Sequence, residues 1–168
     1  MAPPPGNSDI VKCLGFIFAF FGDECRKRKA GRCGSSAFGF ALLWAENSRS
    51  VHGAADDPYY RLNDPQHNDF GAWQYAAPDG SEALLGFVQP RVRTNAAPIC
   101  LRLCGLDGQA TYRVDDFRVS CHKDTVWNRR VNDMTGMTFT GAQLMYAGLA
   151  LPRLLGDCPA LLIHFVRV

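Results

Sequence analysis

Short apolar and alternating runs, separated by turn-forming residues, fill the chain from Asp57 onward. Gly, Pro, Asp and Asn stand between these runs. Such spacing is typical of antiparallel β structure. We therefore expect strands at residues 72–76, 82–88, 99–103, 110–114, 117–121, 137–140 and 161–168. Short strands at this spacing predict an all-β domain, an antiparallel β-sandwich of Greek-key type.

The separators explain where two of the expected strands end. In "APDG", residues 77–80, Pro occupies the second and Gly the fourth position of a four-residue turn. In "GLDGQ", residues 105–109, an Asp-Gly pair favours another reversal of the chain. Both segments predict connections between antiparallel neighbours.

The last expected strand, "LLIHFVRV", is apolar at both parities, with only His164 and Arg167 polar. Successive side chains of a strand point to opposite faces of the sheet. One face receives Leu161, Ile163 and Phe165, and the other receives Leu162, Val166 and Val168. We expect this strand to be central and covered on both faces.

Residues 1–56 follow neither a helical nor a strand period. We treat them as an unassigned extension, irregular or partly helical, for which disorder is one alternative, and residues 57–168 as the sandwich domain. The apolar run 11–21 contains Lys12 and Gly15, precedes the basic tetrad Arg26–Lys29, and lacks a small-residue cleavage site. It is also shorter than the ~20 residues of a membrane span. Neither a signal peptide nor a membrane anchor is indicated, and secreted and cytoplasmic locations both stay open.

Composition and charge exclude several classes of partner. With 168 residues, 47% of them hydrophobic, the chain fits one domain plus an extension. The net charge of +2 is too small for a nucleic-acid footprint. Seven cysteines make an odd count, and no CxxC pair or Asn-x-Ser/Thr acceptor occurs. Reduced thiols are therefore favoured over a disulfide framework.

The stretch "WQYAAPDGSEALLGF" places Asp79 and Glu82 close to aromatic residues, which raises the question of sugar chemistry. A glycosidase needs two carboxyl groups that face each other, about 5–5.5 Å apart for retention or 6.5–9.5 Å for inversion. Here both carboxylates fall at a predicted hairpin tip, where an Asp usually caps its own backbone. Trp73 and Tyr75 share one strand face, as buried core aromatics do. We interpret the segment as a hairpin.

A zinc site is a further alternative for four residues of the types that zinc prefers. The candidates are Cys100, Cys104, Cys121 and His122. Two thiols four residues apart on one strand share a face but lie roughly 13 Å from each other, too far for one ion. We interpret Cys100 and Cys104 as small buried apolar residues and expect no metal site.

Four stretches carry a resemblance to a known enzyme family. They read, in order, "YYRL", "WQYAAPDGSEALLGFV", "LRLCGLDGQATYRV" and "TFTGAQLMYAGLALPRLLGDCPALLIHFVRV". Within them "GLD" precedes "YRV", and Gly141 precedes Leu144-Met145 and Gly148-Leu149. Over residues 57–168 the chain resembles the C-terminal domain of the microbial α-galactosidases of glycoside hydrolase family 36.

The resemblance implies that this sandwich follows a catalytic (β/α)₈ barrel in a complete enzyme. The family removes terminal α-linked galactose from oligosaccharides such as melibiose or raffinose, with retention, through a galactosyl-aspartate, and without a cofactor. The barrel would be the domain's partner, and galactosides would bind through the barrel. A whole barrel of ~250 residues does not fit in this chain.

No catalytic residue of the family carries over to this sequence. The family's nucleophile lies in a Lys-Trp-Asp context, whereas the tryptophans here stand in "LWAEN", "AWQYA" and "VWNRR". Its acid/base aspartate follows a Ser/Gly-rich run and an Arg, and "GRCGSSAFGFALL" lacks both the Arg and the Asp after that run. Galactose-binding residues of the family come from other domains. We expect no hydrolysis by the chain alone.

Two functions from different classes remain. The first is a fragment of an α-galactosidase, whose lost partner leaves an apolar surface and favours self-association. The second is a stand-alone carbohydrate-binding or accessory module, which requires exposed aromatic rings as a platform for sugars. The candidate rings are Tyr59, Tyr60, Trp73, Trp127 and Tyr146.

Overall fold

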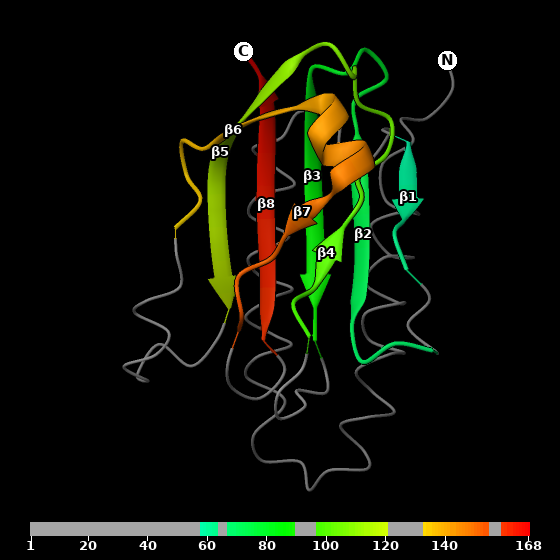
Figure 1. The fold of residues 1–168 in the computed structure, drawn as a ribbon, viewed down its shortest axis with the longest axis vertical. Helices are drawn as coiled ribbons and strands as arrows, with labels where there is room; N and C mark the ends of the chain where they lie inside the picture. The colour runs from blue at the N-terminus through cyan, green and yellow to red at the C-terminus, as the bar shows by residue number, and fades with distance from the viewer. Residues whose placement is uncertain (1–57, 64–66, 90–96, 121–132, 155–158) are drawn as a thin grey trace, which may run out of the picture.

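A computed structural model of the chain describes residues 58–63, 67–89, 97–120, 133–154 and 159–168. These residues form two antiparallel sheets, a large one behind a small one in Figure 1. The large sheet has the order β1-β2-β3-β8-β5-β6 and the small one pairs β4 with β7. The strands of the large sheet are β1 (Tyr59–Arg61), β2 (Gly71–Ala76), β3 (Glu82–Val88), β5 (Thr111–Ser120), β6 (Thr138–Thr140) and β8 (Ala160–Arg167).

A thin layer covers one face of the large sheet. It consists of β4 (Cys100–Leu101), the π-helix η2 (Gln143–Ala147) and β7 (Leu149–Ala150), all on the viewer's side in Figure 1. We call the covered side of the large sheet its first face. The core cluster lies there, and its largest fully buried members are Leu85, Phe87, Leu103, Tyr112, Leu144, Leu149, Leu161, Ile163 and Phe165. The all-β sandwich expected from the sequence is confirmed, with two sheets of unequal size.

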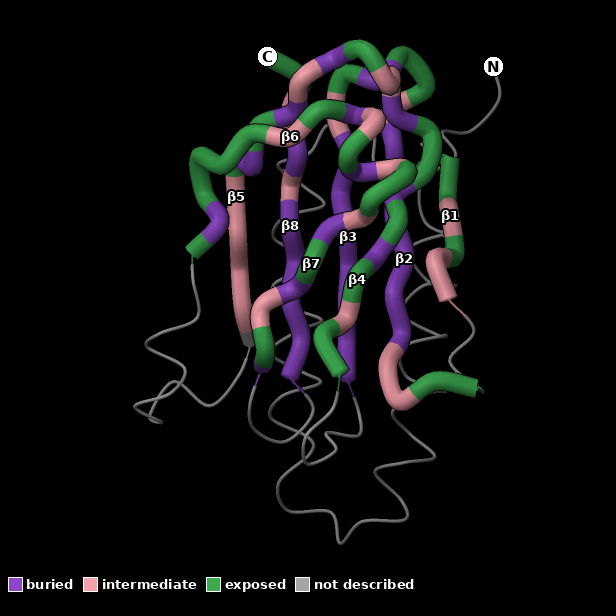
Figure 2. Tube along the Cα trace, in the orientation of Figure 1, coloured by how far each residue is buried: buried purple, intermediate pink, exposed green. Residues whose placement is uncertain are grey.

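Strand β8 lies at the centre of the large sheet, as its apolar pattern predicts. It pairs with β3 on one side and with β5 on the other. The chain passes from β5 and β6 into the small sheet at β7 and then returns beside β5, a Greek-key type of return. Figure 2 shows β2, β3 and most of β8 in the colour of buried residues.

One long strand replaces the two that the sequence predicts at residues 110–114 and 117–121. The register of β5 against β8 shifts between Val114 and Asp116, so that Asp115 is the extra residue of a β-bulge. A bulge lets a strand continue past a residue that has no partner. Asp115 and Asp116, which separate the two expected strands, lie at this irregularity in the structure.

Other boundaries differ from expectation because the elements are short. The strand expected at 99–103 is only Cys100–Leu101, since the N–H of Leu103 donates to the carbonyl of Leu144, at 3.0 Å, instead of to a strand. β1, β7 and the π-helix were not predicted. The turn at residues 77–80 is confirmed by the hydrogen bond from the N–H of Gly80 to the carbonyl of Ala77, at 2.9 Å.

Glycine is required at Gly141, where the chain enters the covering layer. A Cβ placed there would approach the carbonyl oxygen of Asp107 to 2.0 Å. Only a residue without a side chain permits this approach. The N–H of Gly141 also donates to the carbonyl of Ala110, at 2.8 Å. The glycine therefore brings the segment before the π-helix directly onto the loop between the two layers.

Candidate functional site

The carboxylate of Asp79 is bound within its own hairpin. Its Oδ1 accepts a hydrogen bond from the N–H of Ser81 at 2.9 Å. Hydrogen bonds from the side chain and then from the backbone of Ser81 lower the pKa of Asp79 below its usual value of 3.8. The residue is exposed. This confirms the interpretation of the aspartate as a turn residue that caps the backbone.

Glu82 has a different partner, on the large sheet. Its Oε2 lies 3.0 Å from Nε2 of His164, across β3 and β8. The side chain of His164 is 13% exposed and that of Glu82 is 25% exposed. The two hairpin carboxylates thus contact different neighbours, Asp79 at the tip and Glu82 on the sheet.

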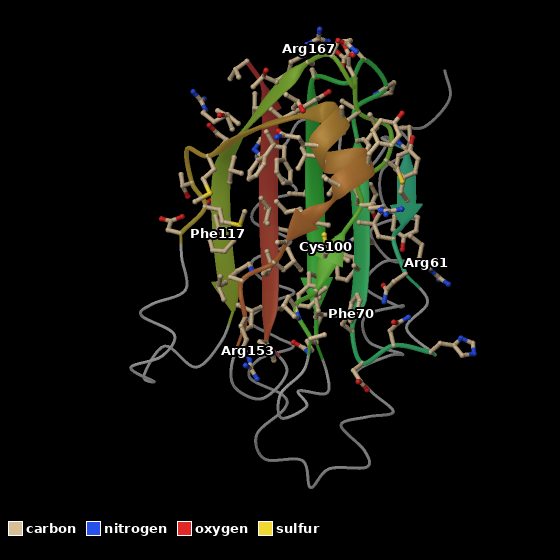
Figure 3. All side chains as sticks on the ribbon, in the orientation of Figure 1. Arg61, Phe70, Cys100, Phe117, Arg153 and Arg167 are labelled. Atoms are coloured by element: carbon tan, nitrogen blue, oxygen red, sulfur yellow. The ribbon has the colours of Figure 1, made fainter. Side chains whose placement is uncertain are left out.

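The cysteines differ from expectation. Cys100 and Cys104 are exposed and unpaired, so their interpretation as buried apolar residues is wrong. The reason is the thinness of the covering layer: Leu101 is buried, while Cys100 lies on the exposed side of β4 (Figure 3). Its Sγ donates to the carbonyl of Ala147 at 3.4 Å.

The metal site considered from the sequence has no counterpart among the described residues. There, no three His, Cys, Asp or Glu residues gather so as to hold an ion. Cys121 and His122 lie outside the described residues, as do the tetrad Arg26–Lys29 and Trp127. The same described part has no helix long and apolar enough to span a membrane.

The candidate aromatic platform is dispersed. Trp73 is buried, and Tyr60 is half-buried against the core. Tyr59 and Tyr146 are exposed, but Tyr59 pairs with Tyr75 on the large sheet whereas Tyr146 belongs to the π-helix of the covering layer. The described rings therefore do not form one surface for a sugar.

The large sheet is also apolar on its second face, the side away from the covering layer. Its buried residues there alternate with those of the core cluster and are not members of it: Trp73, Tyr75, Leu84, Val88, Ala160 and Leu162. All six are at most 6% exposed. Tyr59 extends this face at the β1 edge, where its ring lies 5.4 Å from that of Tyr75, centroid to centroid.

Charged residues border the second face along β5. Asp116 and Arg118 lie on the second face, because they stand opposite His164 and Leu162 in the register of β5 and β8. The Nε of Arg118 lies 2.6 Å from Oδ2 of Asp116. Together with Glu82 and His164 these residues make a polar margin beside the apolar part of the face. The second face thus combines a large apolar area with a pair of opposite charges at its margin.

Two polar side chains, which the sequence did not single out, attach the covering layer to the large sheet. Gln74 is fully buried; its Nε2 donates to the carbonyl of Cys104 at 2.8 Å, and its Oε1 accepts from the N–H of Cys104 at 2.9 Å. The hydroxyl of Tyr112 donates to the carbonyl of Gly80 at 2.7 Å and accepts from the N–H of Asp107 at 3.0 Å. In the sequence, Gln74 stands between the aromatic strand residues Trp73 and Tyr75, and this isolated polar position was the signal that could have indicated its role.

An ion pair closes the end of the domain that carries the chain's C-terminus. Nη2 of Arg167 lies 3.2 Å from Oδ2 of Asp107, and Arg167 is seen at that end in Figure 3. Both side chains are more than a third exposed, so the pair contributes little to stability. The hairpin turn, the loop of Asp107 and the C-terminal strand meet there through these contacts.

Comparison with known proteins places this architecture in a family. Residues 71–165 match the model of the glycosyl hydrolase family 36 C-terminal domain. The chain is 32% identical over 94 residues to α-galactosidase AgaA of Geobacillus stearothermophilus, covering 56% of this chain and 10% of that protein. It is 34% identical over 90 residues to α-galactosidase C of Emericella nidulans, covering 54% of this chain and 10% of the relative.

A solved structure agrees with these matches. The crystal structure of the family 36 α-galactosidase AgaA of Geobacillus stearothermophilus superposes with a TM-score of 0.58 and 25% identity, covering 77% of this chain and 16% of that one. The chain therefore spans about a tenth of the length of the curated relatives it matches. The match covers β2 through most of β8, including the hairpin, Gln74, Tyr112 and Gly141. The chain belongs to the family of glycosyl hydrolase family 36 C-terminal domains.

Proposed function

We propose that this chain is the C-terminal, non-catalytic domain of an α-galactosidase that removes terminal α-linked galactose from oligosaccharides. The observation that carries the proposal is the family match over residues 71–165, together with relatives named as α-galactosidases. The match covers about a tenth of the length of those relatives, so we assign the hydrolysis of the galactoside to residues of the complete enzyme outside the matched domain. Hydrolysis would retain the anomeric configuration and need no cofactor.

The carboxylates of the described residues support a non-catalytic role. A glycosidase needs a carboxylic acid with a raised pKa beside an ionised one. The pKa values of Asp79 and Asp133 are instead lowered, in both cases by hydrogen bonds from a residue two positions later. Glu82, Asp107 and Asp116 are engaged by His164, Arg167 and Arg118. These carboxylates have structural partners.

The partner in this proposal is the catalytic barrel of the complete enzyme. The described part of the chain begins at the edge strand β1, whose Tyr59 is 45% exposed. We place the contact with the barrel at this exposed aromatic, because an exposed large apolar side chain beside the point where the preceding chain enters is suited to pack against a neighbouring domain. Galactosides would bind to the barrel, and the present domain would hold the barrel in position.

The test compares the chain with its native source. The purified chain of 18.5 kDa is assayed for release of galactose from melibiose, after its folding is verified by cooperative thermal unfolding. We expect no release. In parallel, an antibody raised against residues 57–168 isolates the native protein from source extracts, and we expect a several-fold larger species with galactosidase activity. Turnover by the folded short chain, or an inactive larger species, would overturn the proposal.

A further inference from the structure

The covering layer has an outward side that carries no charge. Its elements β4, the π-helix and β7 direct Leu101, Leu144 and Leu149 into the core, and in Figure 2 β4 and β7 alternate between buried and exposed positions. The outward side of an antiparallel layer that faces water is normally polar. Here the exposed residues of the three elements, which we call the outer surface, are Cys100, Gln143, Tyr146, Ala147 and Ala150.

The residues of the outer surface lie next to one another. Cys100 stands opposite Ala150 in the small sheet, and its Sγ lies 3.4 Å from the carbonyl oxygen of Ala147. Tyr146, the neighbour of Ala147, is 74% exposed. On β5, by contrast, the exposed positions hold Arg113 and Asp115, which form an ion pair at 3.3 Å. Because the cores of protein interfaces are poor in charge and rich in aromatic rings, the outer surface has the composition of a contact.

The first strand of the domain is attached to the same layer. The ring of Tyr60 in β1 lies against Gly105, where a Cβ would stand 2.7 Å from the hydroxyl oxygen and 3.0 Å from Cε2 of that ring. The side chain of Gln74 in β2 holds the backbone of Cys104 through two hydrogen bonds, at 2.8 and 2.9 Å. Cys104 and Gly105 follow β4 in the chain. A domain that contacts the β1 side would therefore adjoin the loop that leads into the covering layer.

From these observations we propose that the outer surface of the covering layer packs against the catalytic barrel of the complete enzyme. The inference rests on the proposed function, in which the barrel is the partner, and it extends the contact from Tyr59 of β1 to the layer. The matched domain makes up about a tenth of its relatives, so a complete enzyme holds a much larger part that this domain can contact. Tyr146 projects farthest and is the anchor of the contact, as tyrosines often are. The complementary area of the barrel is uncharged, because a charge buried there would lack a partner.

Hydroxyl-radical footprinting tests the contact. The folded chain of 168 residues is compared with the complete enzyme, isolated from the source and released from the antibody, and oxidation of each residue is measured by mass spectrometry. We expect Cys100 and Tyr146 to be oxidised about tenfold more slowly in the complete enzyme, because the centre of an interface excludes water. Met137 is the control: it is 45% exposed, and its carbonyl accepts from the N–H of Val114 on β5, away from the outer surface. Its rate should be the same in both proteins.

A pair of variants of the complete enzyme makes the test specific. Tyr146→Glu places a charge in the contact and should raise the oxidation of Cys100 to the rate of the short chain, whereas Met137→Glu should leave Cys100 protected. Both positions are exposed in the domain, so its own folding is retained. An active complete enzyme whose Cys100 and Tyr146 react as fast as in the short chain would overturn this inference alone. A source that contains no larger, active species would overturn the proposed function as well.

Discussion

The indole ring of Trp73 lies over Gly86, its antiparallel neighbour on β3. A Cβ at Gly86 would stand 2.5 Å from Cε2 and 2.7 Å from Cζ2 and Nε1 of that ring. The absence of a side chain on one strand therefore creates the space that the aromatic ring of the next strand fills. This relationship builds the apolar part of the second face from two residues 13 positions apart in the chain.

Replacing Gly86 by Ala should destabilise the domain. The added methyl group displaces the buried indole, and overpacking of this kind costs about 1–3 kcal/mol. The free energy of unfolding is measured in urea. The matched control is Gly71→Ala on β2, where the new Cβ meets only Cγ1 of Val88 at 3.5 Å, an ordinary contact. Equal stability of the two variants would contradict the packing described.

Replacing Gln74 by Met should loosen the covering layer. The substitution removes both hydrogen bonds between the Gln74 side chain and the backbone of Cys104, and because these bonds are only partly buried, each loss should cost about 1 kcal/mol. We expect a lower melting temperature and faster amide exchange at Cys104. Gln109→Met, at an exposed position, is the control. A variant with unchanged exchange at Cys104 would show that the two hydrogen bonds do not hold this loop.

Removing the hydroxyl of Tyr112 should also reduce stability. In Tyr112→Phe the carbonyl of Gly80 and the N–H of Asp107 lose a buried partner, at a cost of about 1–3 kcal/mol. The same change at Tyr146, which is 74% exposed, should have little effect. Thermal unfolding of both variants makes the comparison, and a harmless Tyr112→Phe would refute the assigned role.

Asp79 should contribute to the acid sensitivity of the domain. Its pKa is lowered in the folded state from the usual 3.8 by the hydrogen bonds of Ser81, so its stabilising effect is present above about pH 4 and is lost as the pH falls through the folded value. Asp79→Asn should therefore lose less stability than the unmodified chain as the pH falls below about 4. Titration of the carboxyl carbon by NMR should give a value below 3.8, and a higher one in Ser81→Ala. A pKa of 3.8 or above in the unmodified chain is the contrary result.

The exposure of Cys100 and Cys104 predicts their reaction in the folded chain. Iodoacetamide at neutral pH, followed by peptide mass mapping, should find both thiols alkylated before the domain unfolds. Urea-unfolded protein gives the reference extent of labelling. Protection of either thiol in the native state would favour the buried position that the sequence predicted.

The sequence predicted the local structure well where a run was long or a turn had its own chemistry. The β2–β3 hairpin has the predicted boundary at residues 77–80, because Pro and Gly supply the dihedral angles of the turn. Strand β8 is apolar on both of its faces, and this pattern predicted its place at the centre of the sheet. Very short elements such as β1 and β7 escaped prediction, since two or three residues carry no period.

The all-β class, the two apolar sides of the last strand and the resemblance to the family 36 C-terminal domain could all be predicted from the order of the residues. Three features could not: Glu82 lies against His164, 82 residues away, Asp115 makes a bulge, and Cys100 and Cys104 are exposed. Periodicity and turn chemistry act between near neighbours, whereas register, burial and ion pairing depend on which distant strand lies alongside. The alternation of apolar and polar residues assigns each side chain to one face of its strand, and the packing of distant strands determines which residues that face contacts.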